Sequence, residues 1–345
     1  MKVLLVSFVL FVLLLGGCNR EESNPISSPS DDRVSFEINF LQYSDNNYFI
    51  DEVYTDTSAE FNIYNLYYGS LIPTVLPKYF IKDFEVYISI NQINQTLNSI
   101  VAHAYIDLPP RTSSNMYSDS LRYNNIIPVG QEELMRFRLL DDSGDYIFHP
   151  ETGYITFLFS IMDQDAIAVV YRIENDSPTD SDDLIYGEFI SELVNNSKTR
   201  GVLKLVKPMN LNPLFKAAWK LKMKNIYQIT PNPGQITNLD LDIYLKNSDG
   251  SESNTINNIR LLELFGFDKL TENRSPGSDG KFDNRIGINF EPRTSEIIFP
   301  VIEPFSHNIP SMLNKYKYQA IYDTIKTYLS LPDNSFIIKG KYKPI

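Results

Sequence analysis

The chain has 345 residues, a formal net charge of −12 and a pI near 4.8, so its acidic surface is expected to repel nucleic acid. Its 22 Tyr and 21 Phe, against one Trp, favour pleated and half-buried strands. The single cysteine, Cys18, excludes a disulfide framework.

The N-terminus predicts a lipid-anchored protein. Lys2 precedes an apolar run, residues 3–15, that is shorter than the roughly 20 residues needed to cross a bilayer. The run ends in LGGC, which resembles the lipobox of bacterial lipoproteins. We therefore expect a signal peptide over residues 1–17, a covalent lipid on Cys18 and attachment to the outer membrane. Whether the protein faces the periplasm or the cell surface stays open.

A linker and a β-rich part are expected next. Residues 18–32 have no apolar periodicity and are rich in Ser, Pro, Asn and acid, which indicates a flexible linker. Between residues 33 and 198, apolar and polar residues alternate with the period of strands. The segments are 34–41, 60–68, 83–90, 99–108, 154–160 and 166–173, the last two expected to pair.

The part from residue 199 to 345 mixes strands and helices. Strands are expected at 201–206, 219–227, 237–245 and 336–342, although a helix at 219–227 stays open. A single helical turn is expected at 212–213, a short helix at 257–265 before Gly266, and one longer helix at 311–330. The fold class predicted is α+β, dominated by antiparallel, sandwich-like sheets with a few short helices and that longer C-terminal helix.

Eleven short blocks occur in one order along the chain. They read DFEVYISI, IVAHAYIDLP, AIAVVYRI, YGEFI, VLKLVKP, WKLKMKNIYQI, LLELFGFDKL, SDGKFDN, IIFPVIEPF, IYDT and FIIKGKY. Together they resemble the N-terminal domain family of SprA, an outer-membrane protein of the type IX secretion system of gliding Bacteroidota. The resemblance covers residues 83–342.

This resemblance implies a role in type IX secretion or gliding motility. The full family protein resembles an export channel, and this chain is too short to carry that pore together with the module. Parts 33–198 and 199–345 are then two portions of one module, which the lipid on Cys18 attaches to the membrane. Protein partners, among them type IX components, are the expectation.

An acidic loop offers a calcium hypothesis. Asp268, Asp279 and Asp283 could supply the hard oxygen ligands that Ca²⁺ takes, together with nearby Asn, Ser and Gly residues. Their spacing does not match the twelve-residue EF-hand loop. The alternative is an Asp/Gly turn that precedes a hairpin, with strands in residues 286–290 and 296–300.

No catalytic motif stands out, and the protein is expected not to be an enzyme. The patterns of serine hydrolases, zinc proteases and P-loop NTPases are missing from the sequence. The histidines, His103, His149 and His307, are interpreted as structural or surface residues. The basic row of Lys216, Lys220, Lys222 and Lys224 could be a solvated strand face, or could meet lipid headgroups or an acidic partner.

Two function hypotheses follow. The first is a non-enzymatic outer-membrane lipoprotein that acts through protein contacts in type IX secretion or gliding, with no cofactor other than its lipid or a possible calcium ion. The second is a cell-surface lipoprotein that binds a glycan or a host protein and shares only the fold.

Overall fold

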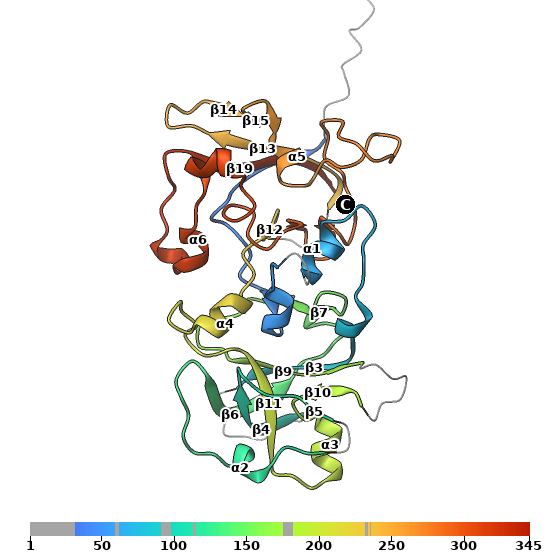
Figure 1. Ribbon diagram of the computed structural model, residues 1–345, viewed down its shortest axis with the longest axis vertical. Helices are drawn as coiled ribbons and strands as arrows, with labels where there is room; N and C mark the ends of the chain where they lie inside the picture. The colour runs from blue at the N-terminus through green and yellow to red at the C-terminus, as the bar shows by residue number, and fades with distance from the viewer. Residues whose placement is uncertain are drawn as a thin grey trace, which may run out of the picture. The chain divides into compact units, whose positions relative to one another are not determined.

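The computed structural model describes residues 32–58, 62–90, 98–112, 115–174, 182–231, 234 and 236–345. Within them, residues Arg33–Ile345 form one compact unit. Antiparallel sheets dominate and the helices are short, so the predicted α+β class is confirmed (Figure 1). The longer C-terminal helix is the one element of that prediction that is wrong, as described below.

The largest sheet contains a closed ring of five strands. In the order of their pairing, its strands are β11 (Arg200–Lys207), β4 (Ser99–Tyr105), β6 (Glu132–Leu139), β3 (Ile81–Ser89), β9 (Ile167–Ile173), β10 (Leu184–Tyr186) and β5 (Arg111–Thr112). β11 pairs in parallel with β4 and antiparallel with β9, which closes the ring and leaves β10 and β5 as an extension.

Small side chains fill this ring. Ala102, Ala104 and Ala168 are fully buried beside Phe137 and Leu203. Alternate residues of a strand point to opposite faces, so the other face of β3 and β9 packs a second core. That core lies against the sheet β2-β8-β7, made of β2 (Asn47–Phe49), β8 (Tyr154–Phe157) and β7 (Tyr146–His149).

The predicted pairing of 154–160 with 166–173 is wrong. β8 forms its hairpin with β7, and β9 pairs with β3. The chain turns at Gly153, whose φ is +61° and where a Cβ would lie 2.4 Å from the ring of Tyr54. Only glycine adopts this conformation without a clash, so the chain turns at Gly153. The hairpin therefore joins β7 to β8, not the two segments that were predicted to pair.

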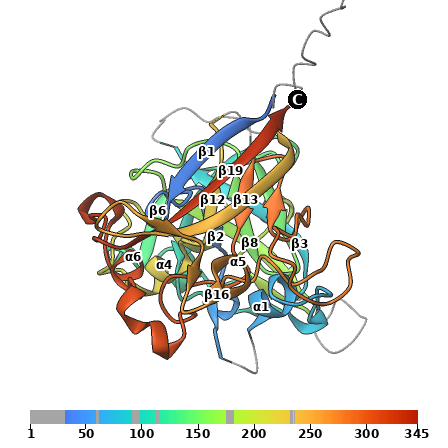
Figure 2. The same cartoon turned by 90° about the horizontal axis from the view of Figure 1, so that it is seen from above.

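A third core lies under a sheet that joins both ends of the compact unit. Its order is β1 (Val34–Asn39), β19 (Ser335–Pro344), β13 (Ile236–Lys246) and β14 (Glu252–Ser253), and Figure 2 shows the first three side by side. Beneath it pack the sheet of β12 (Ile226–Gln228), β18 (Glu296–Ile298) and β17 (Phe290–Glu291), and the hairpin β15 (Thr255–Ile256) with β16 (Ile259–Arg260). A hairpin is confirmed in β17 and β18, but its first strand is Phe290–Glu291 rather than the predicted 286–290, of which residues 287–289 form a turn.

The helices are α1 (Ile63–Tyr68), α2 (Asp119–Arg122), α3 (Ile190–Asn195), α4 (Lys216–Leu221), α5 (Leu261–Leu264) and α6 (Ala320–Asp323). The 3-10 helices are η1 (Glu52–Thr55), η2 (Pro77–Tyr79), η3 (Ser311–Tyr316) and η4 (Lys326–Tyr328). The short helix expected before Gly266 is present as α5. The strand expected at 60–68 is wrong: α1 forms because Asn62 caps it by accepting from the Asn65 N–H, and it buries Tyr64 and Tyr68 one turn apart.

The helix predicted for 311–330 is wrong, because that segment divides into η3, α6 and η4. Its backbone leaves the helical region at Thr324, where φ is −133° and ψ is 149°. The Tyr318 N–H donates to Phe305 O at 2.8 Å instead of continuing a helical ladder. Leu313 and Ile321 are buried in the third core, so tertiary packing outweighs helix propensity here.

The division predicted at residue 198 does not separate the sheets. β11 follows that position but completes the ring with β4 and β9, and β1 precedes it but pairs with β19. Strands from both portions therefore share hydrogen-bonded ladders.

Candidate functional site

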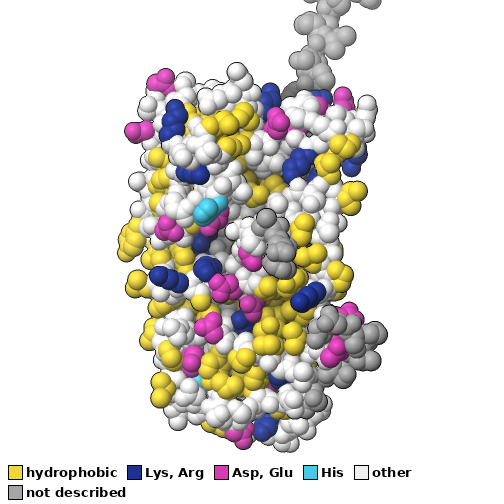
Figure 3. All heavy atoms as spheres, viewed as in Figure 1, with side chains coloured by type: hydrophobic (Ala, Val, Ile, Leu, Met, Phe, Trp, Pro, Cys, Tyr) yellow, Lys and Arg dark blue, Asp and Glu magenta, His cyan; other side chains and the backbone are white. Residues whose placement is uncertain are grey.

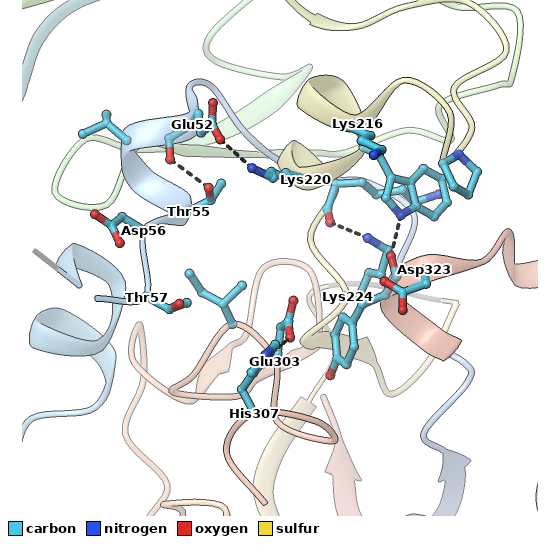
Figure 4. Close-up of a pocket in the computed structure, with 16 residues that line it drawn as sticks. Glu52, Thr55, Asp56, Thr57, Lys216, Lys220, Lys224, Glu303, His307 and Asp323 are labelled. Carbon is cyan, nitrogen blue, oxygen red and sulfur yellow. Dashed lines mark hydrogen bonds and ion pairs between the residues drawn. The ribbon is translucent and has the colours of Figure 1, made fainter. Parts of the chain in front are cut away.

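A cleft of about 810 Å³ lies between three segments of the chain. Its walls are η1 with residues 55–57, α4 with residues 222–224, and the C-terminal residues 302–307 and 322–323 (Figure 4). The volume lies within the range of ligand pockets, roughly 300–1,000 Å³. Figure 3 shows basic, acidic and histidine side chains gathered in the middle of the face seen there.

The strand predicted for 219–227 is wrong over its first half, and the correction shapes the cleft. α4 occupies Lys216–Leu221 and buries Ala218, Trp219 and Leu221. The one-turn helix expected at 212–213 begins instead at Lys216. Extended backbone resumes after the helix, and only Ile226–Gln228 form a strand.

Because α4 ends at Leu221, the four lysines of the basic row lie on two different segments and differ in exposure. Lys216 and Lys220 lie one turn apart on the exposed side of α4, whereas Lys222 is half-buried and Lys224 is buried. Lys220 Nζ lies 2.6 Å from Glu52 Oε1, and Lys222 Nζ lies 2.7 Å from Asp45 Oδ1. The four lysines are therefore not one solvated strand face.

Trp219 lines the cleft and connects two of its walls. Its indole Nε1 donates to Tyr322 O at 2.5 Å, which ties α4 to α6. Lys224 Nζ lies 4.5 Å from the centre of the indole ring, a cation–π distance. The indole thus holds the lysine amine against the cleft wall.

Lys224 is the most unusual charge in the cleft. The residue is 5% exposed, and its Nζ donates to Lys222 O at 3.3 Å. Within the described part of the chain, no carboxylate lies at ion-pair distance from it. Burial lowers the pKa of Lys224 to about 7, and Lys222 adds to that effect, whereas Glu303, Asp323 and Asp45 oppose it.

Contacts with nearby residues of the sequence position the two carboxylates of the C-terminal wall, Glu303 and Asp323. Glu303 pairs with the exposed imidazole of His307, and Asp323 Oδ1 accepts from Gln319 Nε2 at 3.3 Å. These two carboxylates face the same cavity as Lys224. The cleft therefore presents an amine on one wall and carboxylates on another.

The other two histidines do not line this cleft, and His149 is half-buried. His103 is buried in β4, with Nε2 2.7 Å from Glu132 Oε2 and Nδ1 2.8 Å from the Tyr105 hydroxyl. Burial lowers its pKa, against the opposing effect of Glu132. His149 stacks on Tyr154 with ring centres 3.9 Å apart, and loss of solvation lowers its pKa to about 3.

The three candidate calcium ligands organise the loop between α5 and β17. Asp268 accepts from the Ser278 hydroxyl at 2.7 Å and from the Asp279 and Gly280 N–H groups at 2.9 and 2.8 Å. Asp283 Oδ2 accepts from the Lys269 and Leu270 N–H groups.

Asp279 accepts from the Lys281 N–H at 3.0 Å. Across the described ranges, no group of three His, Cys, Asp or Glu residues has the arrangement of a metal site. Calcium binding stays a hypothesis, which calorimetry with CaCl₂ would test.

Cys18, its signal peptide and the linker lie outside the described residues. Among the residues that are described, none of the helices combines the length and apolar character needed to cross a bilayer. The lipid attachment therefore stays a prediction.

Sequence reasoning noticed the lysine row but missed the cleft. Trp219 falls in the strand expected at 219–227, and Glu303 and Tyr322, which line the same cleft, are about 80 to 100 residues away in the sequence. The signal that could have indicated a helix was the apolar group of Ala218, Trp219 and Leu221, which is spaced for one face of a helical turn.

No protein-family model and no curated protein matches this chain.

Proposed function

We propose that this chain is a non-enzymatic, lipid-anchored outer-membrane protein that acts through protein contacts in type IX secretion or gliding motility. The observation that carries the proposal is the ordered series of eleven blocks resembling the SprA N-terminal family, together with the LGGC motif that resembles a lipobox and ends in Cys18. The lipid would supply membrane attachment, and the compact unit would supply the binding surfaces.

The positions of the blocks support this proposal. Four of them coincide with strands of the closed ring: DFEVYISI with β3, IVAHAYIDLP with β4, AIAVVYRI with β9 and VLKLVKP with β11. The WKLKMKNIYQI block, residues 219–229, includes the last three residues of α4 and the wall of the cleft that carries Lys224. Blocks of the resemblance therefore occur both in the ring and in one candidate contact surface.

Gene deletion tests the role. A strain without this gene should secrete less type IX cargo or spread less on agar, and the intact gene should restore both. A gene carrying Cys18→Ala should fail to restore them, and its product should not incorporate an alkyne-labelled palmitate. Normal secretion and spreading in the deletion strain would contradict the proposal.

A second candidate is a cell-surface protein that binds a glycan or a host protein. The observation in its favour is the 810 Å³ cleft, whose lining includes Trp219, His307 and several carboxylates. Against it, the two aromatic side chains that are largely exposed among the described residues, Tyr123 and Tyr328, belong to separate elements and form no platform. A glycan array with the purified full-length chain would separate the candidates.

A further inference from the structure

The buried cations of this fold differ in how many acceptors surround them. Lys204 Nζ lies 2.8 Å from Asp51 Oδ2 and donates to Ile106 O at 2.5 Å. Lys207 Nζ donates to the carbonyls of Met162, Asp163 and Asp165 at 2.6–3.1 Å. Among the described residues, Lys224 has one acceptor, at 3.3 Å.

An ammonium group has three N–H donors, so two donors of Lys224 have no acceptor within the ranges that the structure describes. A buried donor without an acceptor costs folding free energy, and this residue is 5% exposed. Lys224 also lines the cleft, where Figure 4 shows it beside Asp323, and its Nζ lies 4.5 Å from the centre of the Trp219 ring. The surplus donors are therefore placed where a ligand entering the cleft can accept them.

We propose that the cleft binds a peptide through a single carboxylate, which accepts a hydrogen bond from Lys224 Nζ above the Trp219 ring. This inference depends on the proposed function for the peptide nature of the ligand. Binding of a carboxylate is a property of the cleft that can be measured without it.

The charges of the cleft favour a carboxylate over a phosphate. Glu303 and Asp323 line the same cavity and would repel a dianion more strongly than a monoanion. They also offer acceptors for the amide N–H groups or a basic side chain of the same peptide. Lys216 at the exposed side of α4 would attract an acidic segment toward the cleft, whereas the charge of Lys220 is paired with Glu52.

Affinity should depend on pH through Lys224. The groups facing it are Lys222 on its own segment, Glu303 and Asp323 on the C-terminal wall, and Asp45 on the loop before β2. Because its pKa is about 7, the amine is charged at pH 6 and largely neutral at pH 8. A ligand that needs the ammonium form should bind about tenfold more weakly at pH 8 than at pH 6.

The single tryptophan provides the measurement, because Trp219 is in contact with Lys224. The purified full-length chain is titrated with acetyl-Gly-Glu-Gly-amide, with the matching Gln peptide and with inorganic phosphate. Trp219 emission is followed, and calorimetry serves as an independent readout. We expect saturable binding of the Glu peptide, with a Kd on the order of 1 mM, and at least about tenfold weaker binding of the Gln peptide and of phosphate.

Two variants complete the test. Lys224→Met should reduce affinity for the Glu peptide at least about tenfold and abolish its dependence on pH, while its thermal midpoint shows that it folds. The matched control Lys220→Met removes an exposed lysine of the same cleft and should change affinity less than about threefold.

Four results would overturn the inference. They are equal binding of the Glu and Gln peptides, unchanged binding by the Lys224→Met chain, phosphate binding as tight as that of the Glu peptide, and neither heat nor an emission change with any probe. Normal secretion and spreading in the deletion strain would contradict the proposed function, but would not affect the measured binding of the Glu peptide to the cleft.

Discussion

Arg122 and Lys224 are both buried cations, but the fold surrounds them in opposite ways. Arg122 donates from two nitrogens to the two oxygens of Glu188, each at 2.6 Å, and also to the carbonyls of Arg200 and Tyr117. Glu188 in turn accepts from the Tyr117 and Val202 N–H groups. Lys224 has one carbonyl at 3.3 Å and an aromatic ring.

The contrast shows that burial alone does not identify a functional charge. The Arg122 pair joins α2 to the β10–α3 connection and to β11, and its donors are matched within the protein, so it holds the fold together. Lys224 leaves donors toward a cavity. The number of acceptors around a buried charge therefore separates a structural residue from a candidate ligand contact.

Breaking the structural pair should have the largest effect. Glu188→Gln leaves the guanidinium of Arg122 buried without its counter-charge, and we expect a loss of about 3–5 kcal/mol in the free energy of unfolding. Urea denaturation monitored by circular dichroism measures it. Asp119→Asn is the control, because this carboxylate lies 3.4 Å from Arg122 but is mostly exposed. Equal losses in both variants would contradict the comparison.

Lys204→Met should have the next largest effect. The side chain is 7% exposed, and its removal leaves Asp51 without the cation 2.8 Å away. We expect a loss of about 1–3 kcal/mol in the free energy of unfolding, again from urea denaturation. If the Lys204→Met variant were more stable than the parent, the Lys204–Asp51 interaction would not offset the free-energy cost of burying these two charges.

Lys224→Met is the matched substitution with the opposite expected sign. Below its folded pKa of about 7 the amine is charged in both folded and unfolded states, so the folded state bears the full cost of burial. As pH rises from 7 toward the unfolded pKa near 10.5, the unfolded chain binds more protons and that cost disappears.

The Lys224→Met variant should therefore be more stable than the parent by about 1–2 kcal/mol at pH 6, and the gain should shrink above pH 7. Thermal midpoints measured over this pH range test it. A variant that is less stable at pH 6 would show that Lys224 is satisfied within the fold.

The smallest effect is expected at the rim of the cleft. Lys220 and Glu52 form an exposed pair at 2.6 Å, with side chains 57% and 59% exposed. Solvent screens such a pair, so Lys220→Met should change the free energy of unfolding by less than about 0.5 kcal/mol. A larger loss in urea denaturation would mean that this lysine also supports the cleft.

The sequence predicted strands well where one pattern dominated. Alternation predicted β13 almost in full, because every second residue from Leu239 to Leu245 is buried. The expected bounds of β3 and β19 are also close to the observed ones, although consecutive residues are buried in both strands. The helix at 311–330 failed for a different reason: Leu313 and Ile321 have apolar partners in distant strands, and local propensity does not record those contacts.

The cleft was harder to predict than the fold. Its walls come from residues near 52, 220, 303 and 323, which no local pattern links. The properties of Lys224 depend on being covered by Trp219 and the α6 segment, and an isolated KLKMK stretch has the same letters whether it is exposed or buried. What could be predicted was that lysines cluster there.

The pairing of β1 with β19 has a mechanical consequence. A force applied at Arg33 would load the ladder at its Val34–Tyr342 end, so the pairs would yield one at a time rather than together. The first residues of β1 are mostly exposed and resist little, whereas Ile38 and Phe40 are anchored in the third core. Peeling the four residues that precede Ile38 should lengthen the chain by about 14 Å and then stop there, so β1 would act as a short elastic element at the N-terminal end of the compact unit.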